Sequence, residues 1–136
     1  MKYWINTISL DHVTRGVAGG FTQAGHGKAN GLKRLSKDDW IVFYSPRTSY
    51  SEGEVLQAFT AIGRVSDDAS YRFEMSPTFI PWRRNVTFLE SKQALIKPML
   101  NDLSFIVDKQ HWGYKFRLGL FEIPEDDFNV IKQSMQ

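Results

Sequence analysis

The sequence has 136 residues, 42% hydrophobic and 24% charged, with a formal net charge of +2 at pH 7 and no cysteine. This composition excludes a disordered chain, and no stretch is apolar for long enough to span a bilayer. The lack of cysteine excludes disulfides and thiol catalysis. Since there is also no apolar leader, we expect one cytoplasmic domain over residues 1–136.

The first third of the chain predicts two strands separated by a short helix. Residues 3–9 are rich in aromatic and β-branched residues, which favours a strand. A helix is expected from residue 10 to about residue 17, with Ser9 as its N-cap and Asp11 in its first turn. The continuous apolar run at residues 40–44, stopped by Ser45-Pro46, predicts a strand buried on both faces at the centre of a sheet.

The remaining elements indicate the fold class. In order, we expect a long strand at 54–65, a hairpin turn at 67–68, a returning strand at 71–75, a strand at 82–89, a helix at 94–103, a last strand at 114–123 and a terminal helix from 124. Strands at hairpin spacing with few, short helices indicate an α+β fold with a curved, mainly antiparallel, barrel-like sheet and short flanking helices.

The segment from residue 16 to residue 37 differs most from an ordinary core. It holds six of the ten glycines and no acid. Glycine at this density lets backbone amides approach a ligand closely. The segment also offers a stacking face, an amide, an imidazole and several cations: Phe21, Gln23, His26, Lys28, Lys33, Arg34 and Lys37. These groups suit a flat, polar or anionic ligand such as a nucleobase or nucleotide. A basic loop that only connects two elements is the alternative.

Catalytic and metal motifs are weak. The three histidines, His12, His26 and His111, do not pair at ligand spacing, and the glycine segment lacks the spacing of a phosphate-binding P-loop. We therefore expect no metal, no cofactor and no catalysis. Two alternatives stay open. One is an enzyme acting on a nucleotide or modified base with His26 or His111 as general acid or base. The other is a module whose basic face binds a protein.

The sequence resembles the EVE-domain family of the PUA-like superfamily, which is related to YTH and ASCH domains. The resemblance rests on YWINTIS at the start, HVTRGVAGGFTQAGHGK, DDWIVFYSP, PWRRNV, and HWGYKFRLGLFEI near the end. It implies a small, barrel-like curved sheet flanked by helices. It also implies a pocket that holds a flipped, modified nucleobase of RNA or DNA.

The resemblance also suggests which residues meet the base. Ser9 falls where the polar residue after the first strand would lie, and Phe21-Thr22 falls where the YTH relatives place a cage tryptophan and a following serine. Because phenylalanine is a smaller wall than tryptophan, a preference for an N-methyl mark does not carry over. Gln23, His26 and Lys28 match the loop of the EVE family itself.

The predicted site follows from these observations. We expect base contacts from Ser9, Phe21, Thr22, Gln23, His26 and Trp112. We expect phosphate contacts from Lys28, Lys33, Arg34, Arg83 and Arg84, since each basic side chain near a phosphate strengthens binding in a salt-sensitive way. The expected partner is a nucleic acid, with no membrane contact and a monomeric state.

Overall fold

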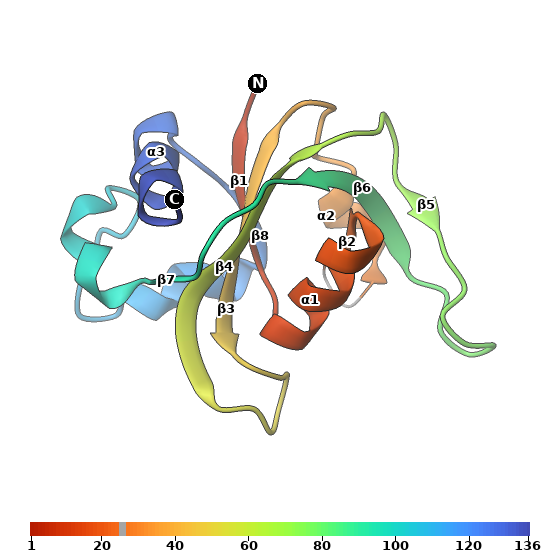
Figure 1. Ribbon diagram of the computed structural model, residues 1–136, viewed down its shortest axis with the longest axis horizontal. Helices are drawn as coiled ribbons and strands as arrows, with labels where there is room; N and C mark the ends of the chain where they lie inside the picture. The colour runs from red at the N-terminus through yellow and green to blue at the C-terminus, as the bar shows by residue number, and fades with distance from the viewer. Residues whose placement is uncertain (25–26) are drawn as a thin grey trace.

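The computed structural model describes residues 1–24 and 27–136, and it forms a curled, mixed sheet with a few short helices (Figure 1). The elements are β1 (Tyr3–Thr7), α1 (Leu10–Gly19), β2 (Phe21–Thr22), α2 (Ala29–Leu32), β3 (Trp40–Arg47), β4 (Val55–Val65), β5 (Tyr71–Arg72), β6 (Trp82–Phe88), β7 (Ala94–Leu95), the 3-10 helices η2 (Lys97–Asp102) and η3 (Trp112–Leu118), β8 (Leu120–Ile123) and α3 (Glu125–Ser134). This is the α+β half-barrel that the sequence predicts.

The strands are ordered β2-β6-β4-β3-β1-β8, with β5 added to β6 and β7 added to β4. β1 runs parallel to β3, and the other strand pairs of the described chain are antiparallel. The buried run at residues 40–44 lies in β3 near the centre of the sheet, as predicted, although the strand continues to Arg47. A register shift against β4 between Phe43 and Tyr44 is a bulge of the kind that bends a sheet.

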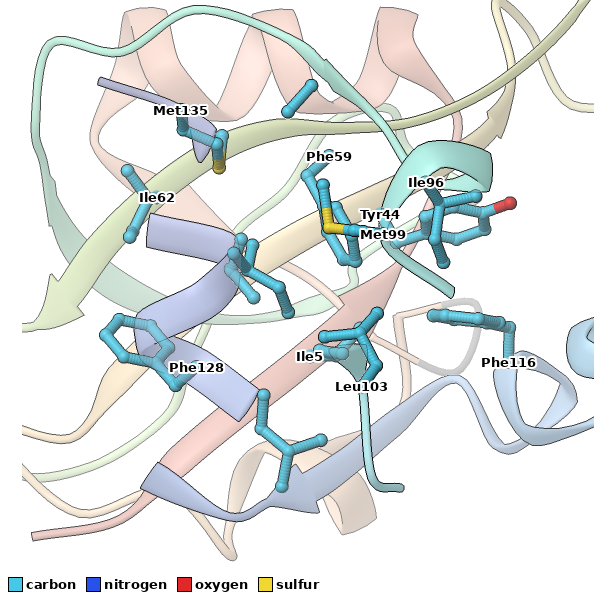
Figure 2. Packing of buried hydrophobic residues seen from close by; sticks show 14 of the residues in the cluster. Ile5, Tyr44, Phe59, Ile62, Ile96, Met99, Leu103, Phe116, Phe128 and Met135 are labelled. Carbon is cyan, nitrogen blue, oxygen red and sulfur yellow. The ribbon is translucent and has the colours of Figure 1, made fainter. Parts of the chain in front are cut away.

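One face of the sheet, here called the closed face, is covered by α3, η2 and η3 (Figure 1). Phe128, Ile131 and Met135 of the predicted terminal helix are almost completely buried against it. Figure 2 shows Phe128 and Met135 among the apolar side chains of this cluster, together with Ile5, Phe59 and Leu103. The closed face is therefore an ordinary hydrophobic core.

The opposite face, here called the open face, is covered by α1 and α2 (Figure 1). Successive residues of a strand point to opposite faces, so Trp4 packs here while Ile5 packs on the closed face. Buried polar side chains also anchor this side. Asp39 accepts hydrogen bonds from the Trp4 indole nitrogen at 2.9 Å and from the Ser36 amide at 3.0 Å.

Two expected strands differ from the structure. The strand expected at 71–75 is only β5, and it pairs with β6 instead of returning along β4. The strand expected at 114–123 begins as η3 and becomes extended only in β8. The alternating apolar residues suggested one strand, but Gly119, at a φ of 75°, separates the helix from the strand.

The helix expected at 94–103 is divided. Ala94–Leu95 pairs with β4, and the helical part, η2, starts with Pro98 in its first turn. Proline at that position is tolerated because its missing N–H would have no partner inside the helix. Among the described residues, no helix is both long and apolar enough to cross a membrane.

Candidate functional site

A cavity of about 860 Å³ opens beside α1 on the open face. Its volume falls within the range of ligand pockets. The wall takes residues from the end of β1, from α1, from β2 and the two residues after it, from β3, from the 73–81 loop and from the 116–120 segment. It includes five of the predicted site residues, namely the base contacts Ser9, Phe21, Thr22 and Gln23 and the phosphate contact Arg34.

Glycines bring Phe21 to the wall. Gly20 has a φ of 73° and its amide donates to the Gly16 carbonyl at 2.7 Å, which ends α1 and turns the chain back. A Cβ on Gly16 would lie 2.5 Å from the Phe21 carbonyl oxygen, so only glycine allows this approach. The predicted loop therefore starts as an edge strand, with Phe21 opposite Asn85 and Thr22 opposite Arg84 of β6.

Asn6 fixes the next part of the wall. Its side-chain nitrogen, which is buried, donates to the Thr22 hydroxyl at 2.9 Å and to the Gln23 carbonyl at 2.8 Å. A buried polar side chain paired in this way costs free energy if its partners are removed. Asn6 therefore ties β1 to the segment that carries Thr22 and Gln23. The sequence showed it only as one polar residue in a strand.

Ser9 occupies the N-cap position of α1 but does not cap it. Its hydroxyl donates to the Asp11 carboxylate, which also accepts the His12 amide at 2.9 Å. Burial raises the pKa of Asp11, but the Ser9 hydroxyl, the His12 amide and the charges of His12 and Arg15 outweigh it and lower the pKa below its ordinary value. Ser9 therefore faces the cavity with an oxygen whose proton is already donated.

The rim of the cavity is cationic. Arg15, Arg34 and Arg117 contribute to it, with His12, and the described lining residues include no aspartate or glutamate. Arg34 donates to the Leu120 carbonyl at 2.6 Å and lies over the Trp4 ring, while Arg117 lies over the Tyr114 ring. An acid-free cavity with three guanidinium groups at its edge favours an anionic ligand.

Arg83 and Arg84, adjacent on β6, have different roles. The Arg83 guanidinium carbon lies 3.6 Å from the centroid of the Phe21 ring and 3.9 Å from that of Phe73, so it is stacked between two aromatic rings. Burial lowers the pKa of Arg83. Although Arg83 does not line the cavity, it supports the ring of Phe21, which does.

Arg84, also a predicted phosphate contact, is bonded inside the protein. It is 1% exposed and bonds to the Asp67 carboxylate at 2.6 Å, to the Leu32 carbonyl at 3.0 Å and to the Leu35 carbonyl at 2.6 Å. Its donors are therefore engaged within the protein. The sequence could place one of two adjacent strand arginines on each face, but not that both would be buried, Arg83 between aromatic rings and Arg84 among hydrogen-bond acceptors.

The other predicted contacts lie outside the cavity wall. Trp112 packs on the closed face, edge-on to Tyr44 and Phe116. Lys28 and Lys33 are exposed at the two ends of α2 and do not line the cavity. His26 lies outside the described residues.

His111, the other candidate acid or base, is also away from the cavity. It is exposed, bonds to Asp108 at 2.8 Å and stacks on Tyr114. Among the described residues, no three histidine, aspartate or glutamate side chains gather as a metal site requires.

Several wall residues were missed by the sequence reasoning. Thr7 has a buried hydroxyl oxygen with no hydrogen-bond partner among the described residues, and it lines the cavity. Met75 and Phe79, both partly exposed, bring the 73–81 loop to the rim. Phe79 lies between Pro77 and Pro81, in a stretch that was read only as an extended connection, and Met75 was read as the last residue of the strand expected at 71–75.

The chain belongs to the EVE domain family, whose model matches residues 2–134. The chain is 58% identical over 135 residues to a UPF0310 protein of Mycolicibacterium vanbaalenii, covering 99% of this chain and 93% of that protein. It is 40% identical over 134 residues to the UPF0310 protein YdcG of Bacillus subtilis, covering 98% and 92%.

Solved structures of low identity share the fold. The YTH domain of the Zygosaccharomyces rouxii MRB1 protein, in complex with N6-methyladenosine RNA, matches with a TM-score of 0.63 at 14% identity, covering 99% of this chain and 87% of that one. Rpa0253 from Rhodopseudomonas palustris matches with a TM-score of 0.59 at 12% identity, covering 99% and 93%. The chain therefore shares its fold with these structures, including the YTH domain.

Proposed function

We propose that the protein binds single-stranded nucleic acid and holds one unstacked, modified nucleobase in the open-face cavity. The observation that carries this proposal is the cavity itself, with an aromatic wall, buried polar groups and a rim of arginines without a described carboxylate. Single-strand binding proteins combine aromatic stacking platforms with a positively charged path for the backbone. The fold shared with an RNA-bound YTH domain supports the same class of ligand.

In the proposed complex, the base stacks on the face of Phe21 that Arg83 does not cover. Ser9, Thr22 and Gln23 meet the edge of the base, and Arg34 with Arg15 and Arg117 meets the backbone. Lys28 and Lys33 remain predicted phosphate contacts farther along the strand. We propose a binding role without catalysis, since His111, the described candidate acid or base, lies outside the cavity wall.

The test is a fluorescence anisotropy titration with labelled single-stranded RNA and DNA, each with an ordinary base or a methylated base at its centre. Phe21→Ala is expected to weaken binding about 5- to 150-fold, because stacking of one base on an aromatic is worth about 1–3 kcal/mol. Leu95→Ala is the control, since Leu95 is exposed on β7 and does not line the cavity. No binding to any oligonucleotide, or binding unchanged by Phe21→Ala, would contradict the proposal.

Titrations at several salt concentrations distinguish phosphate contacts at the arginine rim from base stacking on Phe21. Arg34→Ala and Arg117→Ala are each expected to reduce the slope of log affinity against log salt by about 0.7, the value for one phosphate contact on a single strand. Phe21→Ala is expected to lower affinity at every salt concentration and leave the slope unchanged. If the arginine variants leave the slope unchanged, the phosphate backbone of the nucleic acid does not contact Arg34 and Arg117.

A further inference from the structure

The hydroxyl of Ser9 can accept a hydrogen bond from a ligand but has no proton left to donate to one. Its proton is donated to the Asp11 carboxylate, which accepts hydrogen bonds and has none to give when ionised. Ser9 is 8% exposed and lines the cavity, while Asp11 is not part of the cavity wall. The Ser9 oxygen therefore presents lone pairs to whatever occupies the cavity.

Asp11 is held in the position that this requires. Its carboxylate accepts the His12 amide, and its own amide donates to the Thr48 carbonyl at 3.0 Å. The lowered pKa of Asp11 means that the carboxylate is ionised at neutral pH. A serine bonded to a fixed carboxylate cannot turn its proton toward a ligand without breaking a charge-assisted hydrogen bond.

The neighbouring polar groups share this bias only in part. The Gln23 side-chain nitrogen donates one of its two N–H groups to the sulfur of Met75 at 3.5 Å, while its amide oxygen has both lone pairs available to a ligand. The Thr22 hydroxyl accepts from Asn6 and is within 3.3 Å of the Gln23 carbonyl, so its proton also has a partner in the protein. Thr7 is the exception, because its hydroxyl has no hydrogen-bond partner in the described part of the chain and can donate or accept.

We propose that the cavity selects a base edge that carries N–H donors, such as the amino group of adenine or cytosine, and that Asp11 is the positioning residue that sets this preference through Ser9. The inference rests on the proposed function, because it concerns the edge of the base held by the same cavity. A base edge that offers only acceptors would face the Ser9 oxygen without a hydrogen bond. Leaving buried polar groups unpaired in this way is costly.

The test uses pairs of single-stranded oligonucleotides that differ only in the exocyclic amino group of the central base. One pair carries adenine or unsubstituted purine, and the other carries cytosine or 2-pyrimidinone. The wild-type protein is expected to bind the amino-bearing member of at least one pair about tenfold more tightly, the value of one hydrogen bond lost in a buried site. The readout is the ratio of the two dissociation constants within each pair.

Two variants and one control assign the preference to these residues. Asp11→Ala is expected to bring the ratio toward one, because it frees the Ser9 hydroxyl to rotate and donate. Ser9→Ala is expected to do the same by removing the acceptor, and it is the second variant if Asp11→Ala unfolds. Asp108→Ala is the control, since Asp108 also bonds a neighbouring side chain but is exposed and away from the cavity.

The outcomes distinguish this inference from the proposed function. Equal binding within both pairs by the wild-type protein, with affinity still dependent on Phe21, overturns the inference and leaves the proposed function in place. A preference that persists in both Asp11→Ala and Ser9→Ala also overturns it. Failure to bind any of the oligonucleotides overturns the proposed function and the inference with it.

Discussion

The two faces of the sheet are stabilised in different ways. On the closed face, α3, η2 and η3 cover the strands with apolar side chains such as Phe59 and Phe128, and the space is filled. On the open face the apolar cluster is accompanied by buried polar anchors, Asn6, Asp39 and Arg84, and a cavity remains. Hydrogen bonds between distant segments hold the walls of the open-face cavity in place without filling the cavity itself. The comparison explains how one small fold carries both a core and a cavity.

The largest expected effect on stability comes from removing one of the buried polar anchors of the open face. Arg84→Ala is expected to lower the free energy of unfolding by about 3–5 kcal/mol, because it leaves Asp67 and the Leu32 and Leu35 carbonyls without their partner. Urea denaturation followed by circular dichroism measures this change. If the free energy of unfolding falls only as much as it does when an exposed arginine is replaced by alanine, the open face does not depend on this anchor.

Arg83→Ala is the matched control on the neighbouring residue. It removes two cation–π contacts, each worth about 0.5–1 kcal/mol at an exposed site and about 2 kcal/mol or more when desolvated, and the Phe73 side of the pair is 47% exposed. Its loss of stability is expected to be smaller than that of Arg84→Ala. Its loss of oligonucleotide affinity is expected to be measurable, since Phe21 loses its support. If the order of the two stability losses is reversed, the roles assigned to the two arginines are wrong.

A smaller effect concerns pH. The pKa of Asp11 is lower in the folded protein than its ordinary value of 3.8, so its contribution to stability is present above that value and is lost as the pH falls through the folded pKa. The ratio of affinities for amino-bearing and amino-free bases should therefore be constant from about pH 5 to about pH 8. A ratio that changes within this range would show that Asp11 does not set the preference.

The sequence predicted the parts of the fold that depend on local pattern. The apolar run in β3 and the stripe of Phe128, Ile131 and Met135 in α3 were both confirmed, because a buried strand and an amphipathic helix are readable from spacing. The partner of β5 and the 3-10 turn before Gly119 were wrong, since both depend on contacts with distant segments.

The site was predictable to the same degree. Phe21 and Gln23 stood out by residue type and position, Ser9 was indicated by the family resemblance, and the structure brings all three to one cavity. Arg15 and Arg117 join that rim from segments about a hundred residues apart in the sequence, which no local pattern indicates. Asn6 and Arg84 could not be recognised as anchors, because their partners are set by tertiary packing.

The most direct test of the account is a map of backbone amide chemical shifts as a single-stranded oligonucleotide with an amino-bearing central base is added. The account predicts shifts at Ser9, Phe21, Gln23 and Arg34 on the open face, with the amides of α3 unchanged. Shifts confined to α3 and η2, with the cavity residues unchanged, would contradict it.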